Sequence, residues 1–300
     1  MTSIVFPGQG SQFIGMSKDF YDNFSISRAV LEEIEESTKL QLKKIIFEDP
    51  DNLLNLTQYT QICTFAASVM IFKALESSYL DNSKIDVISD FRNFDIKNGG
   101  MGAPLIPKFH QYLFGSENSK KIIFNIGGIA NGTYLDNKKI MLASDVGPGN
   151  CLMDLVATKR LDSNFDLNGE TASKGKIIES LLKMLHASCV HLDYPRADDK
   201  QDYYKIFNTN FDKYQTEDIL RTLAEFTAEK IKEFYDFCNR PEEIIFHGGG
   251  TMNIFLMELI KDKLGVEIKT TDNEIPSKFV EAAAFAYLAF LEKGEIFEPK

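Results

Sequence analysis

Glycine-rich turns are the first features of this sequence that could do chemistry. Gly127 and Gly128 follow an apolar run at residues 122–126, and glycines at residues 248–250 follow another at 243–246. Such glycines permit positive φ angles and let backbone N–H groups approach an anion. One such turn is more often only a tight turn. Two of them, one opening a helix, make phosphate binding an equally good interpretation, although neither is a Walker A sequence.

Two carboxylates have positions that could serve catalysis or binding. Asp145 closes the apolar run 139–144 and precedes the turn at residues 147–150. A carboxylate held there could activate a water or a hydroxyl, while the sequence alone favours a turn-capping Asp. Glu281 is the only acid in the otherwise apolar segment 279–288. It could satisfy the helix dipole or, if it faces inward, require a partner such as a ligand hydroxyl.

A charged cluster of Asp90, Arg92 and Asp95 precedes a third glycine turn at residues 98–104. An exposed ion pair is the simplest interpretation of this cluster. The four histidines have no metal-ligand spacing, and His247 is expected to be a packed residue at a strand end. We therefore predict no protein-built metal site.

The elements that must position these residues alternate between strands and helices. Residues 122–126, 132–135 and 139–144 predict a three-strand meander, and helices and strands then alternate to the C-terminus. This order predicts an α/β layer fold. The predicted helices are residues 174–186, 216–238 with Thr216 as N-cap, 253–264 ended by Gly265, and 277–291; the predicted strands are 243–246 and 266–270. Residues 25–38 and 59–79 have a helical texture, and a polar stretch at 77–86 marks a boundary.

The bulk composition excludes several classes of protein. Of the 300 residues, 44% are hydrophobic and 26% are charged, which is an ordinary globular balance. The net charge of −11 argues against a general nucleic-acid binder, which needs a basic surface. The N-terminus does not have the pattern of a signal peptide, and no apolar run is long enough to span a membrane. Four scattered cysteines suggest reduced thiols, so we expect a cytoplasmic protein.

The same residues resemble the anhydro-N-acetylmuramic acid kinase family. The resemblance runs from about residue 84 to about residue 291. Its six ordered blocks are SDFRNFD (89–95), GGMGAPLIPKFH (99–110), NIGGIAN (125–131), DVGPGN (145–150), GGGTMN (248–253) and EAAAFAYL (281–288). The sequence departs from the family at residues 195–200, where PRADDK stands in place of a Pro-Lys-Ser-rich loop.

This resemblance implies an actin-like, hexokinase-like ATPase fold of the ribonuclease H type that uses ATP and Mg²⁺. The implied reaction opens 1,6-anhydro-N-acetylmuramic acid, adding water at C1 and phosphate at O6, and gives N-acetylmuramic acid 6-phosphate for murein recycling. The implied partners are an amino sugar, ATP and a second copy of the chain. Neither nucleic acid nor a membrane is among them.

Individual roles follow from the matching positions. The resemblance implies a catalytic acid at Asp145 or at Asp90, and both assignments are kept. It implies sugar binding at Glu281, with Arg92 and Asp95 in the block that carries Asp90. The implied nucleotide-binding residues are Asn125, Gly127, Gly128, Gly248, Gly249, Gly250 and Asn253.

The first 80 residues resemble the start of malonyl-CoA:acyl carrier protein transacylase, through FPGQGSQ (6–12), LTQYTQ (56–61) and AASV (66–69). In that family the residue matching Gln9 lies at the oxyanion hole. The sequence has no Gly-x-Ser-x-Gly elbow, so acyl transfer is the least supported function.

We therefore predict a mostly helical transacylase-like fragment at residues 1–80 and an actin-type ATPase domain at residues 84–300. No counterpart of the family's N-terminal phosphate loop or of its later sugar-binding segment is found in the sequence. Two hypotheses follow. One is a sugar kinase weakened or inactivated by these missing segments, and the other is a non-catalytic fusion product.

Overall fold

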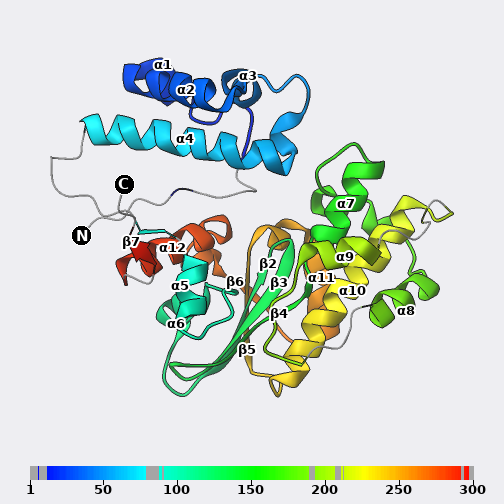
Figure 1. The fold of residues 1–300 in the computed structure, drawn as a ribbon. Coiled ribbons are helices and arrows are strands. Elements are labelled where there is room, and N and C mark those ends of the chain that lie inside the picture. Colours follow the sequence, from blue (N-terminus) through cyan, green and yellow to red (C-terminus); the bar gives the residue numbers. More distant parts are fainter. Residues whose placement is uncertain are drawn as a thin grey trace. The chain divides into compact units, whose positions relative to one another are not determined.

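The computed structural model describes residues 6, 12–78, 88–89, 91–188, 193–206, 211, 213–291 and 294–296. The chain divides into two compact units, residues 2–87 and residues 88–300 (Figure 1). The predicted boundary at residues 77–86 lies next to this division. Asp90 and Gln9, each proposed from sequence, lie outside the described residues.

The described part of residues 2–87 is helical and has its own core. Leu31, Leu42, Ile46 and Met70 are buried at the centre of this core. The predicted helices at residues 25–38 and 59–79 are confirmed, the second beginning two residues earlier. The elements are α1 (Lys18–Asn23), α2 (Ser25–Thr38), α3 (Leu42–Phe47), a 3-10 turn η1 (Leu53–Asn55) and α4 (Thr57–Ser78).

Residues 88–300 form an α/β unit, as the sequence predicts. Its strands are β1 (Ile88–Ser89), β2 (Lys120–Ile126), β3 (Ile129–Asp136), β4 (Lys139–Pro148), β5 (Glu243–His247), β6 (Lys269–Thr270) and β7 (Glu295–Ile296). Its α-helices are α5 (Phe91–Lys97), α6 (Pro107–Phe114), α7 (Cys151–Arg160), α8 (Glu179–Ser188), α9 (Lys200–Ile206), α10 (Thr216–Phe237), α11 (Ile254–Leu264) and α12 (Val280–Phe290). Short 3-10 turns are η2 (Leu167–Gly169), η3 (Ala172–Lys174), η4 (Gly249–Met252), η5 (Thr271–Asn273) and η6 (Ser277–Phe279).

The main sheet has five strands in the order β4-β3-β2-β5-β6. β2, β3 and β4 form the predicted antiparallel meander, and β5 and β6 add parallel to β2 through crossovers. β2, β4 and β5 therefore run in the same direction. Their carboxyl ends meet at one edge of the sheet, where ligands bind in open α/β sheets.

Helices cover both faces of this sheet (Figure 1). Alternate residues of β2 point to opposite faces, as the period of a strand requires. Ile122 and Phe124 belong to the larger core, which α7, α8, α10 and α11 complete. Ile123 belongs to a smaller cluster on the other face together with Phe114 of α6. On that side α6 packs against α12, which brings the last long helix next to the sheet.

Two strands are longer than the sequence predicts, and this corrects the position of Asp145. β3 begins at Ile129, and its pairing with β4 extends to Pro148. Asp145 therefore lies within β4, opposite Asn131. The prediction that Asp145 closes the strand is wrong. Gly147 and Pro148 are residues typical of turns, but here they continue β4. They do so because β3 supplies pairing partners as far as its first residue, Ile129, which pairs with Pro148.

Three predicted helix boundaries also require correction. The helix predicted from residue 174 begins at Glu179. Gly175 has an extended backbone (φ −85°, ψ 171°) and lies against the backbone of Glu217. Thr216 is the first residue of α10, and Gln215 holds the N-cap position. The last predicted helix divides into η6 and α12. Gly265 ends α11 in the left-handed region, as predicted.

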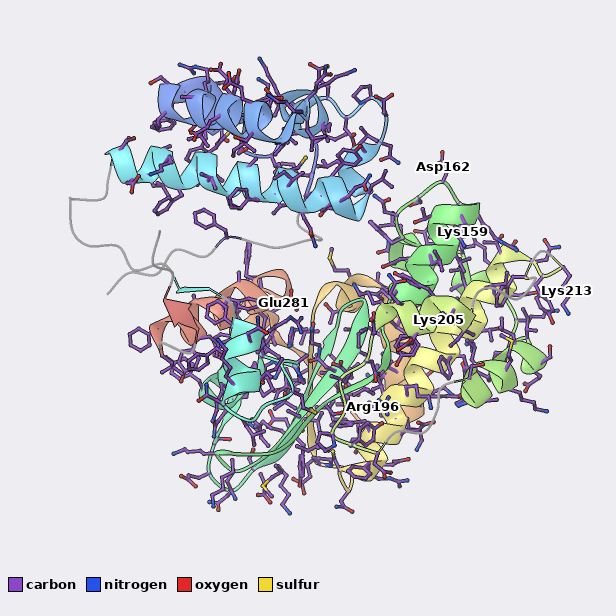
Figure 2. The ribbon with its side chains drawn as sticks, in the orientation of Figure 1. Lys159, Asp162, Arg196, Lys205, Lys213 and Glu281 are labelled. Carbon is purple, nitrogen blue, oxygen red and sulfur yellow. The ribbon has the colours of Figure 1, made fainter. Side chains whose placement is uncertain are left out.

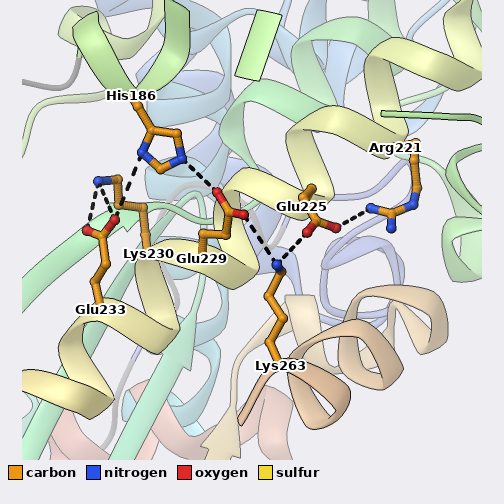
Figure 3. Close-up of polar contacts among 7 residues, drawn as sticks. All are labelled: His186, Arg221, Glu225, Glu229, Lys230, Glu233 and Lys263. Atoms are coloured by element: carbon orange, nitrogen blue, oxygen red, sulfur yellow. Dashed lines mark hydrogen bonds and ion pairs between the residues drawn. The ribbon is translucent and has the colours of Figure 1, made fainter. Parts of the chain in front are cut away.

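A chain of ion pairs joins α8, α10 and α11 on the outer side of the larger core (Figure 3). Glu225 of α10 binds Arg221 at 2.5 Å and also pairs with Lys263 of α11. Lys263 reaches Glu229 at 3.3 Å, and Glu229 accepts from the His186 Nε2 of α8 at 2.6 Å. These contacts fix the helices whose inner faces cover the sheet.

Candidate active site

The two glycine turns lie side by side because β2 and β5 are neighbours. Asn125 pairs with His247 in the register of the two strands, so each turn leaves the same edge of the sheet. Gly248 has φ +91°, and a Cβ atom there would stand 2.3 Å from the Asn125 Oδ1. A Cβ atom on Gly250 would meet the Ile126 Cγ2 at 2.2 Å. Glycine is therefore required for the second turn to pack on the end of β2.

The Gly127 and Gly128 turn is held by the residues that follow β4. The Gly128 carbonyl accepts from the Gly149 N–H at 3.0 Å, and the Gly127 carbonyl accepts from the Asn150 N–H at 2.8 Å. A Cβ atom on Gly149 would stand 2.2 Å from the Gly127 oxygen. The end of β4 and the first glycine turn thus form one tightly packed unit.

A pocket of about 270 Å³ opens at this edge of the sheet. Its walls come from the β2–β3 turn, β4, the start of α9, the segment before α6 and one face of α12. The predicted site residues in its lining are Arg92, Asn125, Gly127, Gly128, Asp145 and Glu281. Ile129, Phe285 and Leu288 contribute an apolar wall. The pocket therefore offers carboxylates and a cation beside an apolar surface, a combination that suits a polar ring-shaped ligand.

Asp145 is the most buried acid of the pocket, with 5% of its surface exposed. Its Oδ2 accepts a hydrogen bond from the Asp198 N–H at 2.8 Å. Burial raises the pKa of Asp145 to about 6, although that hydrogen bond and the charges of Arg196 and Arg92 act to lower it. A carboxylate with this pKa is ionised at neutral pH and is a better proton acceptor than an exposed Asp.

The segment beside Asp145 is itself fixed by polar contacts. The Asp145 N–H donates to the Arg196 carbonyl at 3.0 Å. The Arg196 Nε donates to the Asp198 Oδ1 at 3.0 Å, and the Tyr203 hydroxyl donates to the Asp198 Oδ2 at 2.6 Å. Figure 2 shows Arg196 beside the sheet and Glu281 on α12. These bonds hold the Asp198 N–H in place to bind the Asp145 carboxylate.

Arg92 and Asp95 both act on the third glycine turn. The Arg92 Nη1 donates to the Gly102 carbonyl at 3.0 Å, and the Gly102 N–H donates to the Asp95 Oδ2 at 2.9 Å. Arg92 also lines the pocket, whereas Asp95 does not. The Phe91 ring lies 5.4 Å from the Phe285 ring and links α5 to α12. Arg92 is thereby held at the pocket, where its charge acts on Asp145, while Asp95 stabilises the loop.

Comparison with known proteins identifies the family. The family model for anhydro-N-acetylmuramic acid kinase matches residues 73–296. The chain belongs to the anhydro-N-acetylmuramic acid kinase family. The match begins earlier than the resemblance predicts, inside α4, and ends later. Membership agrees with the actin-like ATPase fold that the resemblance implies.

Curated members of the family from several bacteria are similar to this chain. The kinase of Vibrio vulnificus is 36% identical over 220 residues, which cover 69% of this chain and 58% of the relative. The kinase of Shewanella denitrificans is 37% identical over 213 residues, which cover 68% of this chain and 58% of the relative. The chain thus spans about three fifths of the length of the curated kinases that it matches.

Two solved structures are remotely similar to this chain. The activator of 2-hydroxyisocaproyl-CoA dehydratase from Clostridium difficile has a TM-score of 0.38 at 15% identity, covering 63% of this chain and 66% of that protein. The xylulose kinase of Rhodospirillum rubrum has a TM-score of 0.37 at 15% identity, covering 65% of this chain and 45% of that protein. In the described part of the chain, no helix combines the length and apolar character needed to span a bilayer.

The second glycine turn of this family member does not reach the pocket. The turn packs on the end of β2, and the pocket lining contains none of its three glycines, Gly248, Gly249 and Gly250. Asn253 accepts from the Leu256 N–H at 3.0 Å and is the N-cap of α11. The turn leads into α11 through η4. The prediction that this turn opens the helix directly is therefore wrong.

Three polar lining residues of the pocket are absent from the predicted set: Asn131, Asp198 and Lys200. Asn131 lies in the NIGGIAN block, and its Oδ1 is buried without a hydrogen-bond partner among the described residues. The other two belong to the PRADDK segment, whose departure from the family pattern was the signal in the sequence. Their place in the pocket follows from the packing of this segment along β4.

Proposed function

We propose that this chain phosphorylates 1,6-anhydro-N-acetylmuramic acid at O6 with ATP and opens its anhydro ring with water. The product is N-acetylmuramic acid 6-phosphate, an intermediate of murein recycling. The observation that carries the proposal is Asp145, a buried carboxylate with a pKa raised to about 6, which shares one pocket with the Gly127 and Gly128 turn. Family membership supplies the substrate class.

In the proposed reaction, Asp145 is the general base. It takes a proton from a water whose oxygen bonds to C1, and the C1–O6 bond breaks. O6 bonds to the γ-phosphorus of ATP, and ADP leaves. The proton on Asp145 then passes to solvent. We assign the base to Asp145 because its carboxylate lines the pocket and burial raises its pKa to about 6.

Arg92 and Glu281 are proposed to orient the sugar. Arg92 supplies a cation and Glu281 a carboxylate at the pocket wall, where the apolar face of α12 can hold the ring. Asn131 adds a hydrogen-bond acceptor, because its buried Oδ1 lacks a donor among the described residues. An unsatisfied buried acceptor is costly, so a ligand hydroxyl there would stabilise the complex.

ATP and Mg²⁺ fit the residues of the pocket edge. Open backbone at Gly249, where a Cβ atom would meet nothing within 4 Å, leaves room for a nucleotide beside α11. The described residues contain no cluster of three or more acids, histidines or cysteines that could hold a metal. Mg²⁺ is usually held by one or two carboxylates together with substrate phosphates. Asp198 and the phosphates of ATP would hold the ion, which would neutralise charge on the phosphates.

The test uses the purified chain with ATP, Mg²⁺ and the anhydro sugar in ¹⁸O-labelled water. We expect a sugar phosphate that carries one ¹⁸O at C1, together with an equal amount of ADP. Asp145→Asn should form both products at least about a hundredfold more slowly. Asp136→Asn should match the wild type, because Asp136 is partly exposed and paired with Lys120. ATP binding without any product would support the non-catalytic hypothesis instead.

We further propose a transacylase-like origin for residues 1–80, without acyl transfer. The family match begins only at residue 73, and residues 2–87 have a core of their own. Malonyl-CoA should leave no covalent adduct on the intact chain by mass spectrometry, and a serine ester would refute this.

A cytoplasmic homodimer is also proposed, and light scattering of the purified chain would reveal the dimer.

A further inference from the structure

Lys200 occupies an unusual position in the pocket. It is the first residue of α9, and its side chain lies directly over the first glycine turn. A Cβ atom on Gly128 would stand 2.4 Å from the Lys200 Cε and 2.5 Å from its Nζ. The absence of a side chain at Gly128 is therefore what allows the ammonium group to reach the backbone of the turn.

No residue in the described part of the chain makes a hydrogen bond or an ion pair with the Lys200 Nζ. Lys205, on the same helix, instead pairs with Asp202 at 2.7 Å. The charge of Lys200 acts on Asp154, whose pKa burial nevertheless raises to about 7. Asp154 is thus only partly ionised at neutral pH, so it neutralises the ammonium incompletely.

A second observation in the same pocket points to a ligand. Asn131 also lines it, and the Asn131 Oδ1 is buried without a partner among the described residues. Gly128 lies in the β2–β3 turn, and Asn131 lies in β3 shortly after it. A ligand that satisfies both groups needs an oxyanion for the Lys200 ammonium and a hydroxyl for the Asn131 oxygen.

We propose that Lys200 is a phosphate-binding residue that contacts the phosphoryl group transferred to the sugar, over the backbone of Gly128. The inference rests on the proposed function for the source of this group, which is ATP. Glycine at residue 128 brings the phosphoryl oxygens close to backbone, and a compact ammonium suits them as a point charge. Asn131 then accepts from a hydroxyl of the neighbouring sugar.

The first experiment measures the acetylation rate of each lysine by mass spectrometry on the intact chain. Tripolyphosphate or ATP should slow the acetylation of Lys200 about tenfold and leave Lys205 unchanged, while adenosine should protect neither. Unchanged acetylation of Lys200 at saturating tripolyphosphate overturns the proposal. Protection of Lys200 by N-acetylmuramic acid but not by tripolyphosphate also overturns it, because the oxyanion would then be the sugar carboxylate.

The second experiment compares Lys200→Met with the matched variant Lys205→Met. Lys200→Met should raise the Kd for ATP about tenfold without changing the Kd for adenosine, and Lys200→Arg should restore most of the affinity. Lys205→Met should resemble the wild type. An unchanged Kd for ATP in Lys200→Met refutes the inference even if the sugar is phosphorylated. Protection of Lys200 by tripolyphosphate with no sugar phosphorylation refutes the proposed function alone.

Discussion

At the scale of single residues, the proposed function depends on the protonation state of Asp145. Burial raises its pKa to about 6, so the carboxylate needed for a general base is lost below that pH. Turnover should therefore fall about tenfold per pH unit below pH 6. Asp145→Asn should lower kcat by a factor of about 10² to 10⁴ at pH 7.5.

The measurement is the pH dependence of kcat/KM for the wild type and for Asp154→Asn. The pKa of Asp154 is also raised by burial, to about 7, but Asp154 is not in the pocket lining. The pH profile of kcat/KM for Asp154→Asn should therefore keep its inflection near pH 6. A shift of this inflection in Asp154→Asn would mean that the wrong carboxyl had been assigned.

Stability gives an independent check on Asp145. A carboxyl whose folded pKa is raised above its unfolded value disfavours folding at every pH above the unfolded value. Asp145→Asn should therefore unfold at the same temperature as the wild type or higher at pH 7, while losing turnover. A large fall in melting temperature would show that the lost activity reflects unfolding.

The sequence identified the residues of the pocket that carry a local signal. Gly128 and Asp145 stand beside apolar runs, and Glu281 is an isolated acid in an apolar segment, so each can be selected from its neighbours in the chain. Asn131 and Lys200 could not be assigned a role, because a buried acceptor without a donor exists only after β3 and β4 pair. Lys200 reaches Gly128 only because α9 packs beside a distant turn.

At the scale of elements, sequence periodicity predicted the order of strands and helices better than their ends. β4 continues past Asp145 because β3 pairs with it, and this partner lies outside any local window. Gly175 interrupts a helical pattern because its backbone meets Glu217 of α10. Element ends thus depend on tertiary packing, which the local pattern does not contain.

The ion pairs of Figure 3 make a prediction about the helical layer. Burial acts to raise the pKa of Glu225, but the hydrogen bonds and charges of Lys263 and Arg221 outweigh it, so the pKa is lowered. The pairs therefore stabilise the fold at neutral pH, and this contribution disappears as pH falls through the folded pKa. Glu225→Gln should lower the free energy of unfolding by about 1–3 kcal/mol at pH 7.

The matched control is Asp236→Asn on the same helix, where Asp236 is 36% exposed and pairs with Lys232 and Arg240, whose side chains are 38% and 67% exposed. An exposed pair contributes little, so this variant should lose less than about 1 kcal/mol. Urea unfolding at pH 7 and at pH 3 would measure the free energy of unfolding of both variants. Equal losses in the two variants, or a loss for Glu225→Gln that persists at pH 3, would contradict the argument.

At the scale of the whole molecule, the two compact units should unfold separately. Residues 2–87 and residues 88–300 each contain a buried apolar cluster made of their own residues. Since the pocket is lined only by residues 92–288, a ligand that binds there stabilises only the second unit. The ligand's effect therefore distinguishes two independent units from one cooperative fold.

Scanning calorimetry should show two transitions, and saturating ATP should raise only one of them. At a free concentration about a hundredfold above Kd, binding stabilises the folded state by about 2.7 kcal/mol. For a unit of this size, each kcal/mol raises the melting temperature by roughly 2–4 °C, so the shift should be about 5–10 °C. Hydrogen exchange would assign the shifted transition to residues 88–300. A single transition that moves as a whole would mean that the two units share one cooperative core, because stabilising the pocket would then stabilise α4 and its neighbours equally.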